Sequence, residues 1–227
     1  MKYVLNLPDK TITILGGGGF SNKDLNYCVK QSGALVSADG GANTLIGKAV
    51  VPHYIIGDLD SLKRKEVWQE KGVKLVEIVD QDTTDFEKCI YSCNASLYLC
   101  IGFVGKRVDH FLSVCSTIVK YYSKRLIIVG SHDIIFHIPR SIKLVLPLGT
   151  RVSLFPMDSL KGVKSKGLYW PISGLEFSPS NRIGTSNKTD ERNVSIEVSD
   201  QGMLMILPKS CLEKVIQQFL STDRAMN

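Results

Sequence analysis

The sequence of 227 residues contains no run of 18 or more apolar residues, so it predicts no membrane-spanning helix. Its first segment, MKYVLNLPDKTITIL, lacks the uninterrupted apolar core of a signal peptide, because Asn6, Pro8, Asp9 and Lys10 break it. Hydrophobic residues make up 44% and charged residues 22% of the chain, which excludes wholesale disorder. We therefore expect a folded cytoplasmic protein with no membrane partner.

The six cysteines form no CxxC pair and have no histidines at the spacing of a zinc site. They lie mostly among apolar neighbours, which is typical of reduced residues in a protein core. The formal charge of +6 is spread along the chain, with no basic block and no aromatic platform. These absences argue against a metal-thiolate or redox protein and against a nucleic-acid partner.

Up to residue 140, short β-type runs alternate with helix-like segments. The predicted strands are TITIL (11–15), ALVSA (34–38), HYII (53–56), KLVEIV (74–79), SLYLCIGFV (96–104) and RLIIV (125–129). Most of the segments between them read as helices, with caps predicted at Ser21 or Asn22, at Ser61 and at Thr84. Strands that alternate with helices indicate βαβ units, so residues 1–140 are predicted to form an α/β domain with a largely parallel sheet.

From residue 141 onward the helical periodicity disappears until the final CLEKVIQQFL. Runs such as SIKLVL, TRVSLF, SIEVS and GMLMIL are separated by Pro and Gly turns. Residues 141–227 are therefore predicted to form a smaller antiparallel β-sandwich domain.

Acidic residues follow four of the predicted parallel strands. The loops are DGGAN (39–43), GDLDS (57–61), DQDTTD (80–85) and GKRVDH (105–110). In an open parallel sheet, ligands bind outside the carboxyl ends of the strands, so these four loops are expected to converge on one edge.

Helix capping explains part of this pattern. Ser61 can cap the helix that follows it, and Thr84 with Glu87 matches a capping box. Capping leaves Asp58 and Asp60 unexplained, because both precede the cap. Together with Asp39, Asp82 and Asp85, they would gather negative charge in one crevice, which is costly unless a cation sits there. A DxD pair alone is a weak signal, but the set favours Mg²⁺ bound by carboxylates and substrate phosphates.

Cationic residues accompany these loops. Arg107 can hold phosphate oxygens in a bidentate manner, with Asp109 orienting it or contacting a ribose. Lys88 lies one helical turn after Asp85, where it can face the same crevice or simply pair with Asp85. Gly16 to Gly19 lack both GK[ST] and GxGxxG, so they are interpreted as a flexible turn that approaches the ligand.

The loops in this order resemble thiamine pyrophosphokinase. The matching pieces are ADGGAN, IGDLDS, DQDTTDFEKC and GKRVDH, together with KGLYW (166–170) and GTSN (184–187). The resemblance implies an α/β domain that binds ATP and Mg²⁺, then a thiamine-binding β-sandwich, in a homodimer with active sites at the subunit interface. The implied reaction transfers pyrophosphate from ATP to thiamine and gives thiamine diphosphate and AMP.

The resemblance also implies roles for individual residues. Asp58, Asp60 and Asp85 would ligate Mg²⁺ and, with Arg107, support catalysis. The nucleotide would be held by Asp39, Gln81, Asp82, Thr84, Lys88, Arg107 and Asp109. Thiamine would be bound by Trp170, Ser186 and Asn187. Without the resemblance, Trp170 would be interpreted as a core residue of the sandwich.

One departure from the resemblance is Lys106, which stands where the family usually has a glycine before Arg107. The sequence leaves one rival function open, another Mg²⁺-dependent, ATP-using pyrophospho- or phosphotransferase that acts on a different small alcohol. A second rival, a non-catalytic basic module that binds RNA or a membrane surface, would need an aromatic platform or a basic stripe, and the sequence shows neither.

Overall fold

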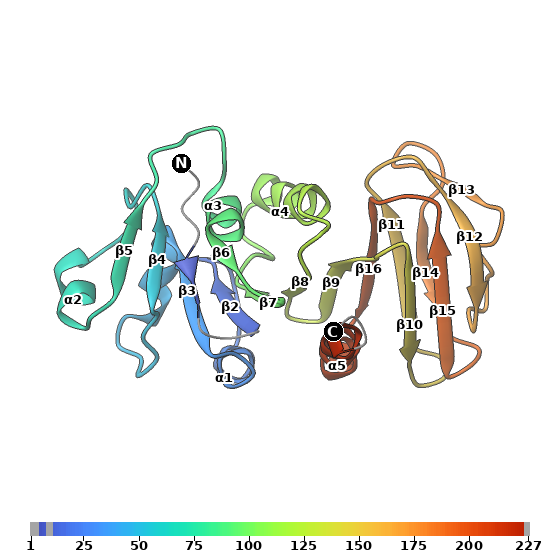
Figure 1. The fold of residues 1–227 in the computed structure, drawn as a ribbon, viewed down its shortest axis with the longest axis horizontal. Helices are drawn as coiled ribbons and strands as arrows, with labels where there is room; N and C mark the ends of the chain where they lie inside the picture. The colour runs from blue at the N-terminus through green and yellow to red at the C-terminus, as the bar shows by residue number, and fades with distance from the viewer. Residues whose placement is uncertain (1–4, 8–10, 225–227) are drawn as a thin grey trace. The chain divides into compact units, whose positions relative to one another are not determined.

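The computed structural model describes residues 5–7 and 11–224, and Figure 1 shows their arrangement into elements. The chain divides into two compact units. The first runs up to Val114 and includes Ile128–Ser131, and the second comprises Cys115–Ile127 and His132 onward.

The first unit is built on parallel strands, as predicted. In sheet order they are β7 (Leu97–Ile101), β2 (Thr11–Leu15), β3 (Ala34–Ala38), β4 (Tyr54–Gly57) and β5 (Lys74–Glu77). Strand β8 (Leu126–Val129) lies next to β7, and a separate short pair joins β1 (Leu5–Asn6) to β6 (Cys93–Asn94). Every residue of β2, β3 and β7 is buried, which is why these strands read as nearly continuous apolar runs.

Two of the predicted helix caps are confirmed. Helix α1 (Asn22–Lys30) follows Ser21, whose side chain accepts a hydrogen bond from the Asp24 amide. Helix α3 (Asp85–Ser92) follows Thr84, whose hydroxyl accepts from the Glu87 amide at 3.3 Å. These contacts satisfy amide groups that have no partner inside the helix.

The cap predicted at Ser61 is wrong. Helix α2 (Lys65–Glu70) starts four residues later, directly after Arg64, which has a left-handed backbone and makes no side-chain cap. The helix is anchored by Trp68, which is 1% exposed and donates its indole N–H to the Lys63 carbonyl at 3.1 Å. Ser61 is therefore available for another contact.

Two helical segments follow the ends of β3 and β7. A 3₁₀ helix, η1 (Asp39–Leu45), directly follows β3, and α4 (Val108–Lys120) follows the loop after β7. All six cysteines of the chain are buried and free, as predicted. No helix among the described residues is long and apolar enough to cross a membrane.

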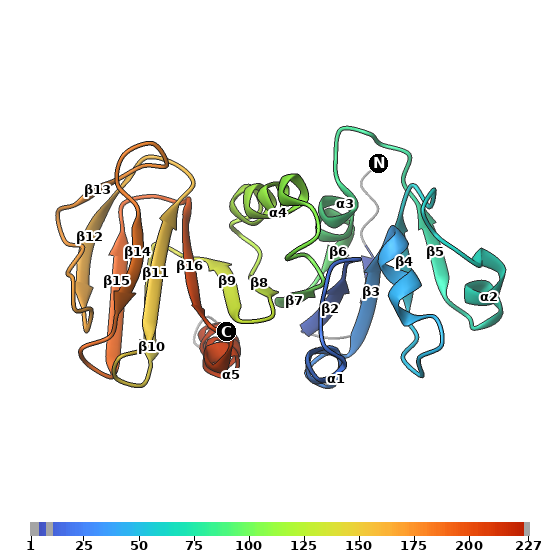
Figure 2. The ribbon, with the colours of Figure 1, turned by 180° about the vertical axis from the view of Figure 1, so that it is seen from behind.

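The second unit contains antiparallel strands in two groups, and Figure 2 shows them from behind. One group has the order β10 (Ser141–Val145), β15 (Asn193–Val198), β12 (Leu160–Lys166), β13 (Glu176–Phe177). The other has the order β14 (Gly184–Lys188), β11 (Arg151–Pro156), β16 (Met203–Pro208), β9 (Asp133–His137). A short η2 (Lys209–Cys211) and α5 (Leu212–Arg224) complete it. The predicted fold class, a parallel α/β part followed by antiparallel β-structure, is confirmed.

Candidate active site

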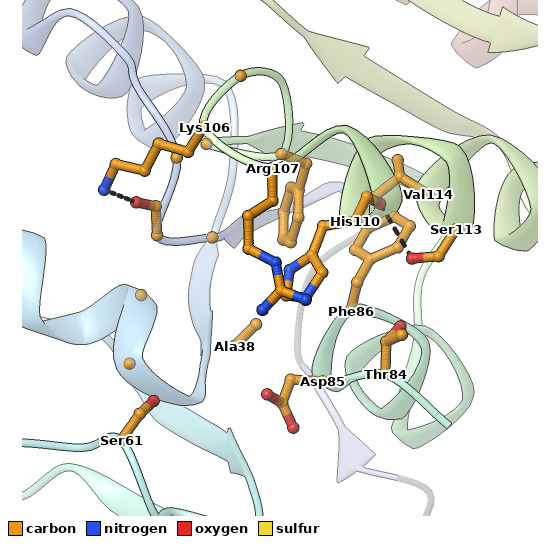
Figure 3. A pocket seen from close by; sticks show the side chains of 18 residues that line it. Ala38, Ser61, Thr84, Asp85, Phe86, Lys106, Arg107, His110, Ser113 and Val114 are labelled. Atoms are coloured by element: carbon orange, nitrogen blue, oxygen red, sulfur yellow. Dashed lines mark hydrogen bonds between the residues drawn. The ribbon is translucent and has the colours of Figure 1, made fainter. Parts of the chain in front are cut away.

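The sheet order reverses beside β2, and a pocket lies at that point. The chain passes from β2 outward through β3, β4 and β5, and then returns with β7 on the other side of β2. Ligands of open α/β sheets bind at such switch points, outside the carboxyl ends of the strands. A cavity of about 270 Å³ is found there, within the first compact unit (Figure 3). The loops after β2, β3, β4 and β7 all contribute to its lining, together with the start of α3.

One wall of this pocket consists of glycine backbone. Gly16 and Gly18 donate their amides to the carbonyls of Ile101 and Gly102, at 2.8 and 2.7 Å. A Cβ atom added to Gly16 would lie 2.5 Å from the Gly102 oxygen, so the two loops touch only because side chains are absent. The sequence indicated that Gly16 to Gly19 approach a ligand, and Gly16 to Gly18 do line the pocket. The role of Gly102 was missed, although a glycine directly after a buried strand is a recognisable signal.

Three carboxylates meet beside the pocket. Asp39, Asp58 and Asp60 each offer one oxygen, and these oxygens lie within 4.8 Å of one another. Asp58 and Asp60 reach the same side because Leu59 between them has a left-handed backbone, with φ of 61°. A group of carboxylate oxygens at this spacing suits a hard divalent cation such as Mg²⁺.

Asp39 is the most deeply buried member of this group, at 2% exposure. Its Oδ2 accepts hydrogen bonds from the hydroxyl of Ser61 and from the Ser61 amide, the latter at 3.3 Å. Its Oδ1 is buried and has no hydrogen-bond partner among residues 5–7 and 11–224. Ser61 thus fixes one oxygen of Asp39, while the other remains free to bind a cation. The expected proximity of Asp39 to Asp58 and Asp60 is confirmed, and its contact with the nucleotide stays a prediction.

Asp85 lies near this group but has its own cationic partner. Lys88, which is 2% exposed, places Nζ 3.1 Å from Asp85 Oδ1 and 3.9 Å from Asp58 Oδ2. Burial raises the pKa of Asp85, and the charges of Asp39 and Asp58 act in the same direction, against the opposing effect of Lys88. Burial also tends to raise the pKa of Asp58. The hydrogen bond from the Asp60 amide and the charge of Lys88 outweigh this effect, so the pKa of Asp58 is lowered. The pairing of Lys88 with Asp85, one of the two roles that its spacing allowed, is therefore present, and its contact with ATP stays a prediction.

Cationic residues line the pocket from the loop before α4. Arg107 donates to both oxygens of Asp109, at 3.1 and 2.6 Å, and this pairing lowers the pKa of Asp109 to about 2. In Figure 3, the side chains of Arg107 and His110 extend into the pocket on the side facing Asp85. Sequence reasoning missed His110, although it follows Arg107 by three residues and so shares its face of the first helical turn.

The other residues predicted to hold the nucleotide divide into two groups. Thr84 lines the pocket at the start of α3. Gln81 and Asp82 lie in an exposed turn outside the pocket lining. Gln81 still contacts the acidic group, because its amide nitrogen lies 3.4 Å from Asp58 Oδ2.

The three residues predicted to bind thiamine lie together in the second unit. Trp170 is 55% exposed and packs edge to face against Tyr169, with ring centroids 4.7 Å apart. It is therefore not a core residue. The buried Asn187 accepts from the Trp170 amide at 3.2 Å and donates to the Trp170 carbonyl at 2.7 Å. Asn187 thus positions Trp170, while Ser186 beside it is exposed and has a left-handed backbone with φ of 64°.

Comparisons with known proteins agree with this arrangement. The family model described as the thiamin pyrophosphokinase catalytic domain matches residues 25–129, and the one described as the vitamin B1 binding domain matches residues 133–204. Thiamine pyrophosphokinase 1 of Oryza sativa subsp. japonica is 30% identical over 209 residues, covering 74% of this chain and 76% of that protein. Thiamine pyrophosphokinase 1 of Arabidopsis thaliana is 28% identical over 200 residues, covering 74% of each.

Solved structures share the fold at lower identity. Yeast thiamin pyrophosphokinase superposes with a TM-score of 0.76 at 19% identity, covering 93% of this chain and 90% of that one. The Candida albicans protein gives a TM-score of 0.75 at 16% identity, covering 91% and 96%. Since the two family models together match most of the sequence, this chain belongs to the thiamin pyrophosphokinase family.

Proposed function

We propose that the protein is a thiamine pyrophosphokinase, which transfers the pyrophosphoryl group of ATP to the hydroxyethyl oxygen of thiamine. The observation that carries this proposal is one pocket lined by Asp85 on one side and by Arg107 on the other, with three further carboxylates beside it. Phosphoryl transfer needs this combination of a metal-binding acidic group and cations for phosphate oxygens.

Asp39, Asp58 and Asp60 would hold a Mg²⁺ ion. Two observations support the fit: the three oxygens lie within 4.8 Å of one another, and the buried Oδ1 of Asp39 lacks a hydrogen-bond partner among the described residues. When bound, Mg²⁺ neutralises phosphate charge and so reduces repulsion toward an incoming oxygen nucleophile. Asp85 is the fourth carboxylate available near this group and was part of the metal set predicted from sequence.

The chain's own residues supply binding, orientation and proton transfer. Arg107, oriented by Asp109, binds phosphate oxygens, while the glycine backbone of residues 16–18 lets the nucleotide approach closely. In the reaction, the thiamine hydroxyl oxygen forms a bond to the β-phosphorus, and the bond from that phosphorus to the α–β bridging oxygen breaks, so that AMP leaves. Asp85 is suited to accept the hydroxyl proton, because it lines the pocket and burial raises its pKa.

Trp170 would present an aromatic face to the cationic rings of thiamine. Its exposure supports this role, since a core residue has no free face. The side-chain amide of Asn187 already forms two hydrogen bonds with the Trp170 backbone. Asn187 would therefore contribute to thiamine binding by positioning Trp170. Ser186 remains available to contact the pyrimidine.

We also propose a homodimer and a cytoplasmic location. Val108 and Leu112 are 74% and 59% exposed, one helical turn apart, which supports burial of this face against another chain. The six buried, free cysteines suit a reducing compartment.

Product analysis after incubation with ATP, Mg²⁺ and thiamine tests the proposal. We expect AMP and thiamine diphosphate, whereas ADP with thiamine monophosphate would indicate a simple kinase, and no turnover would refute the assignment.

Asp58→Asn and Asp60→Asn should each abolish turnover with little loss of fold stability. Trp170→Ala should raise the KM for thiamine strongly while leaving the KM for ATP nearly unchanged, and unchanged thiamine kinetics would contradict the role of Trp170.

A further inference from the structure

Lys106 occupies a conformation that lysine rarely adopts. It lies in the loop between β7 and α4, and its backbone is left-handed with φ of 59°, directly after Gly105 with φ of 96°. Non-glycine residues at positive φ are uncommon, and such strain persists where the surroundings enforce it, often at functional sites. A glycine at position 106 would relieve this strain, so the side chain of Lys106 is the feature that needs an explanation.

The Lys106 side chain reaches across to the opposite loop of the pocket. Its Nζ donates a hydrogen bond to the Gly17 carbonyl at 2.7 Å, joining the loop after β7 to the loop after β2 (Figure 3). Lys106 and Gly17 both line the cavity, so the ammonium lies at its edge. An ammonium group has three protons to donate, and Gly17 is its one hydrogen-bond acceptor among the described residues.

The charge of Lys106 has no protein counter-ion in the described part of the chain. Asp85, which lines the pocket, pairs with Lys88, and Asp109, which is close to Lys106 in the sequence, pairs with Arg107. A phosphate oxygen is a stronger acceptor for an ammonium group than a neutral carbonyl, because the bond is charge-assisted on both sides. A polyanion in the pocket would therefore draw the ammonium away from Gly17.

We propose that Lys106 binds the polyphosphate of the nucleotide, exchanging the Gly17 carbonyl for phosphate oxygens. This residue then favours a nucleoside triphosphate over the monophosphate that the reaction releases, because the triphosphate offers more negative charge. The inference rests on the proposed function in that ATP is taken as the substrate.

Equilibrium titration of ATP with Mg²⁺, and separately of AMP, into wild-type protein and into Lys106→Met tests this role. We expect about tenfold weaker ATP binding in Lys106→Met and less than about a threefold change for AMP. Lys106→Gly should show the same loss for ATP together with a higher Tm, because it removes both the ammonium and the backbone strain. Lys48→Met is the matched control, since Lys48 also donates a single hydrogen bond, to Asn22 at 2.8 Å, but does not line the pocket.

Equal ATP affinity in wild type and Lys106→Met would overturn the inference, and so would an equal loss for ATP and AMP. Wild-type protein that fails to bind ATP would overturn both the inference and the proposed function. Wild-type protein that binds ATP but yields no thiamine diphosphate would refute the proposed reaction alone, and the affinity ratios would still decide the role of Lys106.

Discussion

Replacing Ser61 by alanine tests the role that the structure gives this residue in place of the predicted helix cap. As a helix cap, Ser61 would contribute to stability only. As the donor to Asp39, it fixes a carboxylate that is 2% exposed and belongs to the acidic group. Ser61→Ala keeps the amide hydrogen bond to Asp39 and removes the hydroxyl one. The variant therefore isolates the contribution of a single hydroxyl group.

The expected loss of activity in Ser61→Ala follows from the strength of the hydrogen bond to the buried Asp39. A hydrogen bond to a charged group contributes about 1.5–3 kcal/mol, and the acceptor here, Asp39, is 2% exposed. If the transition state loses this stabilisation because Asp39 is no longer held in place, kcat/KM should fall by roughly 10- to 150-fold, since 1.36 kcal/mol corresponds to a factor of ten. The Mg²⁺ concentration that gives half-maximal rate should also rise.

The assay is AMP release measured against Mg²⁺ concentration, combined with denaturant unfolding. Ser61→Thr, which keeps a hydroxyl, should recover much of the activity. Ser21→Ala is a matched control, because Ser21 is a true cap of α1. It should lose about 1 kcal/mol of stability and keep its activity. If Ser61→Ala behaves like Ser21→Ala, the positioning role of Ser61 is refuted.

Three further outcomes follow from the geometry. Burial lowers the pKa of His137 from 6.5 to about 4, so between these two pH values the unfolded chain binds a proton that the native state does not. As the pH falls from 6.5 to 4, the free energy of unfolding of the wild-type protein should therefore drop by about 3 kcal/mol more than that of His137→Gln. Denaturant unfolding measures both, and an equal drop in the two proteins would contradict this. Gly57→Ala would place a methyl group 2.5 Å from Asp39 Cβ and so displace this carboxylate. Steady-state turnover should fall strongly, while the helix content measured by circular dichroism stays close to that of the wild type. A variant with wild-type turnover would show that the site tolerates the methyl group. Asn187→Ala frees the Trp170 backbone and should raise the KM for thiamine about tenfold with the KM for ATP unchanged; an unaltered thiamine KM would show that Trp170 needs no such support.

The parallel sheet and its functional edge were predictable because their signals are local. Strands buried on both faces read as apolar runs, and side chains at their carboxyl ends share one edge whatever the details of the loops. The caps at Ser21 and Thr84 were also predictable, because each contacts a residue three positions away. Reasoning from spacing works where sequence neighbours are also structural partners.

Ser61 shows where such reasoning stops. A serine before a helix-like segment looks the same whether it caps that helix or binds a distant group. The deciding partner, Asp39, lies 22 residues earlier, and the contact joins the segments that follow β3 and β4. The exposure of Trp170 was similarly hidden, because an aromatic residue among β-strands gives no local sign of which face it occupies.

The unequal burial of the two tryptophans allows ligand binding near Trp170 to be followed by intrinsic fluorescence. The chain contains only Trp68 and Trp170, which are 1% and 55% exposed. Emission from Trp68 should be insensitive to added quenchers, so any change in quenching by soluble acrylamide or by an aromatic ligand comes from Trp170. Occupancy of the second unit can therefore be followed in the unlabelled wild-type chain, with Trp170→Phe as the spectroscopic blank.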